Sequence, residues 1–235
     1  MAYSLFLTVQ QTPNPCEIPS LQKFLETFFP HQENRAYFQA ISGTASVSTH
    51  PSTIVQRLGA LSLLPALLSS AKIPQSSLIF RRNSHGRPFF DPSSTSLSQI
   101  DFNLSHTKNY IAAALLIGDG NVGVDVEDVI PAKRAIPLSR RYCTEGELRT
   151  FKECMNDEEL LAERFTSLWV KREALSKQHG EGMPLRYDAA SIPGHVKLWA
   201  GSISGANAKI AICAPNIDPP SIPFVLSDSI SLDIQ

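Results

Sequence analysis

The sequence predicts an α+β fold in which helices are followed by strands in each of two halves. In the first half, apolar residues at helical spacing between residues 20 and 70 precede two strand-like runs that end near residue 118. In the second half, a long helical pattern over 157–180 precedes residues 184–213, which alternate loosely as strands do. The chain has 235 residues, 43% hydrophobic and 18% charged, which is enough to bury a core.

The first half is predicted to open with a strand over Tyr3–Val9. Ser20–Phe29 carries apolar residues at helical spacing, and we expect Ser20 to be its N-cap. Thr53–Ser70 is predicted to be a buried helix that Pro65 kinks or splits. The remaining segments are a strand over Ser77–Arg82, a turn over 83–88, a polar loop over 91–99, and a hairpin of Phe102–Ser105 and Tyr110–Gly118.

The second half is predicted to begin near residue 118. Its elements are a strand over Val122–Val126, helices over Leu138–Tyr142 and Glu145–Glu153, a long helix capped by Asp157 and ending near Gly180, and two or three strands in 184–213. Residues from 216 onward are rich in proline and serine, and we expect them to be extended or loosely ordered. We therefore divide the chain into two α+β halves, 1–117 and 118–215, and a tail, 216–235.

Composition restricts the function. A net charge of -1 argues against bulk nucleic-acid binding. The four cysteines are far apart and form no C-x-x-C pair, which favours free thiols over a zinc site or a disulfide framework. The start of the chain does not read as a secretory signal, and the apolar run over 58–68 is interrupted and too short to span a bilayer. We expect a cytoplasmic protein that does not enter a membrane.

A pair of carboxylates marks the strand at 122–126. Side chains alternate along a strand, so Val122, Val124 and Val126 should face the core while Asp125 and Glu127 share the other face with a glycine. Two carboxylates at this spacing repel unless a cation lies between them, and Mg²⁺ prefers such oxygen ligands. The alternative is the solvated face of a half-exposed strand.

The long helix carries a second cluster. Trp169, Glu173 and Lys177 are four residues apart and so lie on one face. They could form only a solvated surface with an ion pair. Combined with Asp125 and Glu127, however, Glu173 supplies a third anionic ligand, and Lys177 could offset charge on a phosphate. Together these residues predict a site for phosphoryl-type transfer.

Two further segments could contact an anion. Arg87 follows a glycine in a turn, and His106 ends a strand; either could reach a phosphate, although single basic residues in loops are more often structural or solvated. The sequence shows no G-x-S-x-G, no Walker A and no G-x-G-x-x-G motif.

These segments resemble, in order and spacing, the 4′-phosphopantetheinyl transferases, in particular the long, monomeric surfactin-type branch. The family pattern reads G-K-P, F-N-x-S-H-S, G-[IV]-D-[IV]-E and W-x-x-K-E-x-x-x-K. The matching segments here are 86–88, 102–107, 123–127 and 169–177, and the resemblance covers roughly residues 55–190.

The resemblance implies a pseudo-twofold pair of similar α+β halves with the active site in the cleft between them. It implies binding of coenzyme A and Mg²⁺, and transfer of the phosphopantetheine arm to a serine of an apo carrier protein with release of adenosine 3′,5′-bisphosphate. The implied roles are Mg²⁺ binding by Asp125, Glu127 and Glu173; catalysis by Glu173 as base and by Lys177, which also contacts the diphosphate; and coenzyme A binding by Arg87, Pro88, Ser105 and His106.

The chain departs from the pattern at three positions. Arg87 and Arg172 stand where the family usually has lysine, and Thr107 stands for a serine. Arginine at 87 keeps the charge and offers a bidentate grip. The family also holds the nucleotide's 3′-phosphate with basic residues of the first half; the candidates here are Lys23, Arg35 and Arg57.

The carrier protein is expected to be acidic, and a basic group after the carboxylate strand could attract it. This group comprises Lys133, Arg134, Arg140 and Arg141. A monomer is expected because the two halves would already form the cleft. Two alternatives stay open: a Mg²⁺-dependent phosphohydrolase, and a non-catalytic protein that binds carrier protein or coenzyme A.

Overall fold

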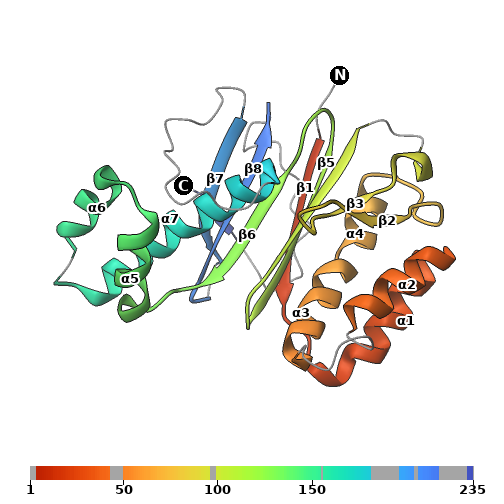
Figure 1. Ribbon diagram of the computed structural model, residues 1–235, viewed down its shortest axis with the longest axis horizontal. Coiled ribbons are helices and arrows are strands. Elements are labelled where there is room, and N and C mark those ends of the chain that lie inside the picture. The colour runs from red at the N-terminus through yellow and green to blue at the C-terminus, as the bar shows by residue number, and fades with distance from the viewer. Residues whose placement is uncertain are drawn as a thin grey trace.

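The computed structural model describes residues 4–42, 50–95, 99–154, 156–180, 196–203, 206–216 and 232–234. Helices and antiparallel sheets are segregated, which confirms the predicted α+β class. Figure 1 shows α1–α4 on one side of the molecule, the long strands in the middle, and α5–α7 on the opposite side.

The first half contains the following elements: β1 (Ser4–Gln11), a 3₁₀ turn (Pro15–Glu17), α1 (Ile18–Phe28), α2 (Gln32–Ile41), α3 (Pro51–Ser62), α4 (Leu64–Ser70), β2 (Phe80–Arg82), β3 (Pro88–Phe90), a second 3₁₀ turn (Pro92–Ser94), β4 (Ile100–His106) and β5 (Tyr110–Ile117). The second half contains β6 (Gly123–Asp128), α5 (Ala132–Tyr142), α6 (Glu145–Lys152), α7 (Glu158–His179), β7 (Val196–Ile203), β8 (Ala208–Pro215) and β9 (Leu232–Ile234).

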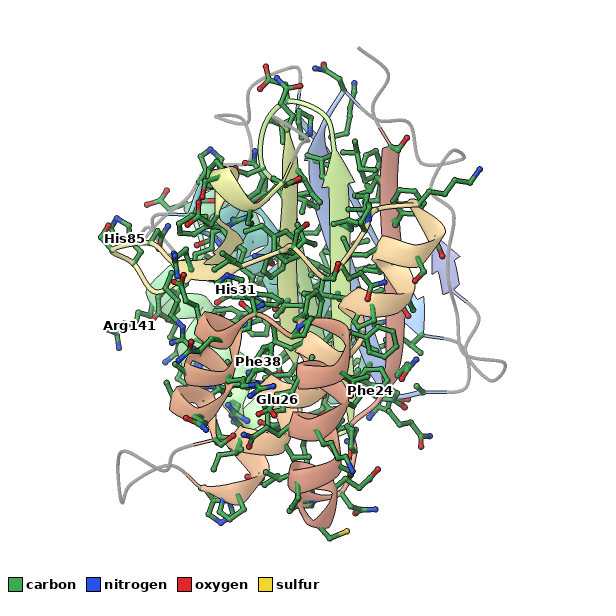
Figure 2. The ribbon with its side chains drawn as sticks, turned by 90° about the vertical axis from the view of Figure 1, so that its right-hand side faces the viewer. Phe24, Glu26, His31, Phe38, His85 and Arg141 are labelled. Carbon is green, nitrogen blue, oxygen red and sulfur yellow. The ribbon has the colours of Figure 1, made fainter. Side chains whose placement is uncertain are left out.

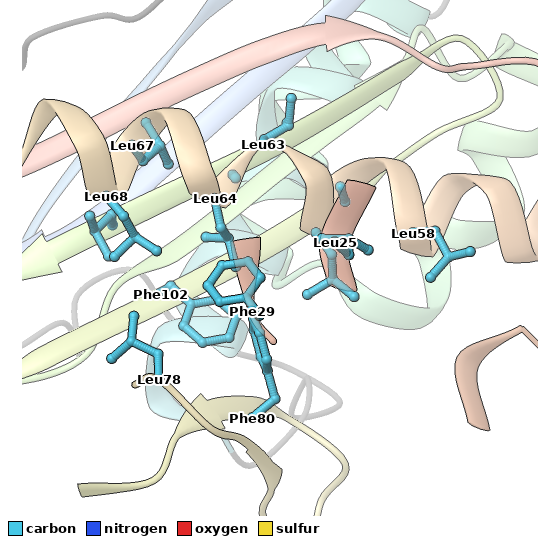
Figure 3. Close-up of a cluster of buried hydrophobic side chains, with 14 of the residues drawn as sticks. Leu25, Phe29, Leu58, Leu63, Leu64, Leu67, Leu68, Leu78, Phe80 and Phe102 are labelled. Carbon is cyan, nitrogen blue, oxygen red and sulfur yellow. The ribbon is translucent and has the colours of Figure 1, made fainter. Parts of the chain in front are cut away.

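The larger sheet of the first half has the strand order β1-β5-β4, with antiparallel neighbours, and β2 and β3 form a separate antiparallel hairpin. β4 and β5 form the predicted hairpin, in which His106 pairs with Ile111. Helices α1–α4 cover one face of this sheet (Figure 1). Phe80 lies at the centre of their core, with five aromatic rings within 5.8 Å of its own, centroid to centroid. Figure 3 shows Phe29, Phe80 and Phe102 packed among the leucines of α3 and α4; Phe80 meets the other two rings edge to face.

By length and composition alone, the Pro51–Ser70 stretch would qualify as one membrane-spanning helix. Its most apolar window is 61% buried within the fold, and the leucines of α3 and α4 form the core shown in Figure 3. The apolar character of this stretch is therefore explained by packing.

The sheet of the second half has the order β6-β8-β7-β9, again antiparallel. Val122, Val124 and Val126 face a core shared with β1 and β5, as the alternation predicted. Helix α7 lies across the other face of β6 and β8, where Val170, Ala174 and other small residues contact the sheet.

Several boundaries differ from the prediction. Ser20 lies inside α1 rather than at its N-cap, because Asn14 and Glu17 form a capping box one turn earlier. Helix α2 was missed, since its few apolar residues leave a weak pattern, although Phe38 and Ile41 are buried. Pro65 does split the Thr53–Ser70 segment, at Leu63. The predicted strand over 77–82 shortens to β2, β3 was not foreseen, and α5 begins six residues earlier than predicted.

The long helix was predicted well. The Asp157 side chain accepts a hydrogen bond from the Leu160 N–H at 2.9 Å, and Gly180 ends α7 in the left-handed conformation with φ of 80°. Strands β7 and β8 confirm two of the strands predicted in 184–213, while 184–195 lie outside the described residues. Of the predicted tail, residues 232–234 pair with β7.

Candidate active site

A cavity of about 440 Å³ opens where the end of β4 meets β6, α5 and α7. It therefore lies between elements of the two halves. Polar and charged residues line it together with a few apolar ones: Leu104, Ser105, His106, Asp125, Glu127, Ile130, Arg134, Leu138, Trp169, Glu173 and Lys177. All three carboxylates and the lysine singled out in the sequence are among them.

The edges of the two sheets are joined by side chains rather than by a backbone ladder. Three residues of β4, each two positions apart, accept hydrogen bonds from backbone N–H groups at alternate positions in and just before β6. The pairs are Asp101 Oδ2 with Val122 N (2.7 Å), Asn103 Oδ1 with Val124 N (3.0 Å) and Ser105 Oγ with Val126 N (3.2 Å). This row, which we call the seam, satisfies the otherwise open edge of β6 and fixes its register against β4.

Asp125 lies at the floor of the cavity and is only 5% exposed. Its Oδ1 accepts hydrogen bonds from Ser105 Oγ at 2.8 Å and from Lys177 Nζ at 2.7 Å. Lys177 Nζ also donates to Ser105 Oγ at 2.9 Å and to the Val124 carbonyl at 3.2 Å. Lys177 thus pairs across the cavity with Asp125, and this excludes the purely solvated helix face that was the alternative reading of the sequence.

The other oxygen of Asp125, Oδ2, is buried and has no hydrogen-bond partner within the described part of the chain. A buried carboxylate oxygen without a partner is costly, because it has lost water and gained nothing in exchange. A cation or a donor from a substrate would compensate for this loss.

Glu127 and Glu173 flank Asp125, and both are partly buried. Burial, followed by the charges of Asp125 and Asp128, raises the pKa of Glu127 to about 7. Burial and the charge of Asp125 also raise the pKa of Glu173, against the opposing effect of Lys177. Glu127 and Glu173 are therefore each close enough to Asp125 for its charge to disfavour their ionisation.

The donor set fits a divalent cation in its chemistry. Asp125 offers an unpartnered buried oxygen, and its charge adds to burial in raising the pKa values of Glu127 and Glu173; a cation would neutralise that charge. However, no three His, Cys, Asp or Glu side chains in the described ranges are gathered tightly enough to hold one ion as they stand. Lys177 supplies the positive charge on Asp125 in this arrangement.

Of the residues expected to hold the nucleotide, His106 and Ser105 line the cavity, whereas Arg87 and Pro88 lie outside it. His106 lines the cavity, and desolvation there, followed by the charges of Lys177 and Arg57, lowers its pKa to about 4. Ser105 is 4% exposed and belongs to the seam. Arg87 and Pro88 do not line the cavity: Pro88 begins β3, and the Arg87 guanidinium is directed into the protein.

Comparison with known proteins identifies the family. The profile of the 4′-phosphopantetheinyl transferase superfamily matches residues 121–200, which include β6, α7 and the three carboxylates. The 4′-phosphopantetheinyl transferase AcpT of Escherichia coli strain K12 is 31% identical over 162 residues, covering 69% of this chain and 75% of AcpT. The chain belongs to the 4′-phosphopantetheinyl transferase superfamily.

More distant members of this superfamily align over shorter stretches. The transferase Gsp of Aneurinibacillus migulanus is 28% identical over 126 residues, 54% of this chain and 48% of Gsp. Sfp of Bacillus subtilis strain 168 is 24% identical over 124 residues, 53% of this chain and 51% of Sfp. The chain thus spans about half the length of these two relatives. At such identities the surfactin-type branch stays a prediction.

The substitution at position 172, relative to the usual lysine of the superfamily, lies outside the cavity. Arg172 is 4% exposed, and its Nη1 donates to both carboxylate oxygens of Glu147, at 2.9 and 2.6 Å. Glu147 also accepts from the Thr144 N–H and so completes the capping box of α6. Arg172 therefore joins α6 to α7 and does not contact the cavity.

Two functional positions, Asp101 and Asn103 of the seam, were not predicted from the sequence. Arg134 was predicted only as one of four basic residues that attract the carrier; it lines the cavity, where its charge opposes the rise in the pKa of Glu127. Polar residues at every second position of a strand beside Phe102 were a usable signal for the seam. Nothing in the sequence distinguishes Arg134 from its basic neighbours. Arg134 faces the cavity because of the orientation of α5, which the sequence does not specify.

Proposed function

We propose that this chain transfers the 4′-phosphopantetheine arm of coenzyme A to a serine hydroxyl of an apo carrier protein, with release of adenosine 3′,5′-bisphosphate. The observation that carries the proposal is the Lys177–Asp125 ion pair beside Glu173 in a cavity between the two halves. The cavity combines the Lys177 ammonium with carboxylates of raised pKa and is open to solvent. These properties suit the attack of a hydroxyl group of another protein on a diphosphate.

Glu173 is the proposed general base. Its partial burial and raised pKa suit a group that accepts the serine proton, directly or through a water molecule, as the oxygen attacks the β-phosphorus of coenzyme A. The new bond joins the serine oxygen to that phosphorus. The bond between phosphorus and the bridging oxygen breaks, and this oxygen leaves with the adenosine 3′,5′-bisphosphate. Lys177, which lines the same cavity, would offset charge on the diphosphate.

Mg²⁺ would be held by Asp125, Glu127 and Glu173, with the remaining ligands supplied by the diphosphate and water. When bound, the ion would neutralise charge on the diphosphate oxygens. The unpartnered Oδ2 of Asp125 supports this assignment. With the ion bound, Asp125 would no longer depend on the charge of Lys177, whose ammonium group would then be available to the diphosphate.

The nucleotide end of coenzyme A is proposed to lie near His106. Of the three basic candidates in the first half, Arg57 is the one whose charge affects the pKa of His106. Arg57 is exposed on α3, so its side chain is available to a phosphate. We therefore assign the 3′-phosphate to Arg57 and His106, while Pro88 would contact the nucleotide through its turn.

The carrier protein is proposed to dock on α5. Arg134 and Leu138 of this helix line the cavity, while Arg140 and Arg141 extend the basic surface along its last turn. Figure 2 shows Arg141 projecting at the edge of the molecule. Its guanidinium lies 5.3 Å from the centroid of the Tyr142 ring, which packs against Trp169 of the cavity. A partner bound on α5 would thus bring its serine to the cavity mouth.

This docking proposal has a direct test. Reversing Arg140 and Arg141 to Glu should raise the KM for an acidic carrier protein by about tenfold or more at low salt, with less effect at high salt. Lys72→Glu, an exposed change on the first half, is the matched control and should not change this KM. An unchanged KM in the double reversal would remove α5 from the docking surface.

The two halves are proposed to be related by a pseudo-twofold axis, with a boundary at 117–118. Each half has an antiparallel sheet with helices packed against one face, and the seam joins strands β4 and β6. A cleft already formed within one chain supports a monomer. We also propose that the protein acts in the cytoplasm, where coenzyme A and carrier proteins would be available.

Release of adenosine 3′,5′-bisphosphate from coenzyme A, with and without apo carrier protein, separates the alternatives. The transferase proposal predicts release only when carrier and Mg²⁺ are both present. Release without carrier would indicate a phosphohydrolase. Binding of carrier and coenzyme A with no release under any condition would indicate a non-catalytic binding protein.

A further inference from the structure

Helix α7 carries Glu173 and Lys177, and its C-terminal end depends on a residue from the other half of the chain. The last carbonyl groups of a helix have no partner within the helix. The Gly180 N–H donates to Ser176 O, so Lys177 O is the first carbonyl with no donor from within the described residues of α7. Arg87, on the turn between β2 and β3, supplies it through Nη1.

The Arg87 guanidinium has further partners that fix its orientation. Nη2 donates to the Val122 carbonyl at 2.8 Å and forms an ion pair with Asp101 Oδ2. The side chain of Arg87 is 11% exposed and that of Asp101 is 12% exposed. Asp101 in turn accepts the Val122 N–H within the seam. One guanidinium therefore connects β4, the start of β6 and the end of α7.

We infer that Arg87, held by Asp101, is a positioning residue that caps α7 from the first half and thereby sets Lys177 and Glu173 against Asp125. A cation at a helix C-terminus also interacts favourably with the helix dipole. The planar fork of arginine can serve two carbonyls and a carboxylate at once, whereas a lysine ammonium at this position could not match all three directions. This role differs from the direct nucleotide contact expected from the sequence.

Hydrogen exchange tests the inference independently of catalysis. Arg87→Met and Asp101→Asn should each speed amide exchange in the last turn of α7, residues 176–180, by about tenfold or more. Asp101→Asn keeps an acceptor for Val122 N and removes only the ion pair. Arg81→Met is the matched control, because Arg81 lies on the same hairpin and pairs with Glu33 and Asp91. Unchanged exchange at 176–180 in Arg87→Met would overturn the inference.

The kinetic arm rests on the proposed function. Arg87→Met should lower kcat for transfer by about tenfold or more, with KM for coenzyme A within about twofold of wild type. The kcat of Arg87→Lys should lie between that of wild type and that of Arg87→Met. The kcat of the Arg87→Met/Asp101→Asn double variant should be no lower than that of Arg87→Met alone. A tenfold rise in KM at unchanged kcat would instead make Arg87 a nucleotide ligand and overturn the inference. If wild-type protein transfers nothing, the proposed function fails, while the exchange rates still decide the role of Arg87.

Discussion

Gly123, at the start of β6, is the position where the active-site geometry is most sensitive to a small change. A Cβ built on Gly123 would lie 1.9 Å from the Ala174 carbonyl oxygen and 2.7 Å from the Gln178 backbone nitrogen. Both atoms belong to the backbone of α7, so no side chain can rotate away. To restore a contact of 3.0 Å, the strand and the helix must separate by at least about 1.1 Å.

The Gly123→Ala change should therefore affect stability and catalysis together. Overpacking of this kind costs about 3 kcal/mol, at the upper end of the usual range, because backbone must shift. For a chain of this size, that corresponds to a fall in Tm of about 6–12 °C. Separation of β6 from α7 also moves Asp125 relative to Lys177 and Glu173, and a displacement of about 1 Å can cost about 100-fold in kcat.

Thermal unfolding and transfer kinetics of Gly123→Ala test this reasoning, with Gly146→Ala as the matched control. A Cβ on Gly146 would meet only Thr144 Oγ1, at 3.9 Å, and Gly146 lies in α6. Since alanine favours a helix, the control should be as stable as wild type or slightly more stable. If the two variants unfold at the same temperature and transfer at the same rate, β6 and α7 do not make the close backbone contact described at Gly123.

Three further changes test other parts of the account. The pKa of Glu127 is raised from 4.5 to about 7 in the folded, metal-free protein, so its stabilising contribution is complete below pH 4.5 and is lost as the pH rises through 7. Allowing for solvent screening, the free energy of unfolding in EDTA should fall by about 1 kcal/mol between pH 5 and 7.5. Mg²⁺ with coenzyme A should reverse this loss. A pH-independent Tm would contradict the raised pKa of Glu127 beside Asp125. Arg172→Met removes the buried partner of Glu147 and should cost about 3 kcal/mol in urea unfolding, whereas Arg172→Lys should cost less; equal stability of Arg172→Met and wild type would contradict the α6–α7 link. Phe80→Ala should cost about 3–5 kcal/mol, because it empties the centre of the first-half core, and a loss below 1 kcal/mol would contradict the packing around this ring.

Much of the fold could be predicted from local patterns. The hairpin of β4 and β5, strand β6 and helix α7 each carry their own signals, namely alternation, apolar spacing, an Asp cap and a terminal glycine. Helix α2 could not be predicted in this way, because it has few apolar residues and its buried Asn34 satisfies the backbone of Leu78 and Phe80. The fold thus uses a polar contact there that no periodicity encodes.

The candidate site likewise has features that the sequence predicted and features that depend on tertiary packing. Residue types and spacing predicted that Asp125, Glu173 and Lys177 would act together, and the structure brings them to one cavity. Gly123 was predicted to share a strand face with Asp125 and Glu127, but its close contact with the backbone of α7 could be revealed only by tertiary packing. For the same reason, the inward direction of Arg87 could not be read from a Gly-Arg-Pro turn.

Intact-mass spectrometry of a panel of apo carrier proteins tests the central claim most directly. Each carrier is incubated with coenzyme A, Mg²⁺ and either the wild-type protein or its Glu173→Gln variant, and a carrier whose acceptor serine is changed to alanine serves as a control. The proposed transferase activity predicts a mass gain of one phosphopantetheine on at least one carrier, absent with Glu173→Gln and absent from the serine variant. A gain that persists with Glu173→Gln, or no gain on any carrier although coenzyme A is bound, would contradict it.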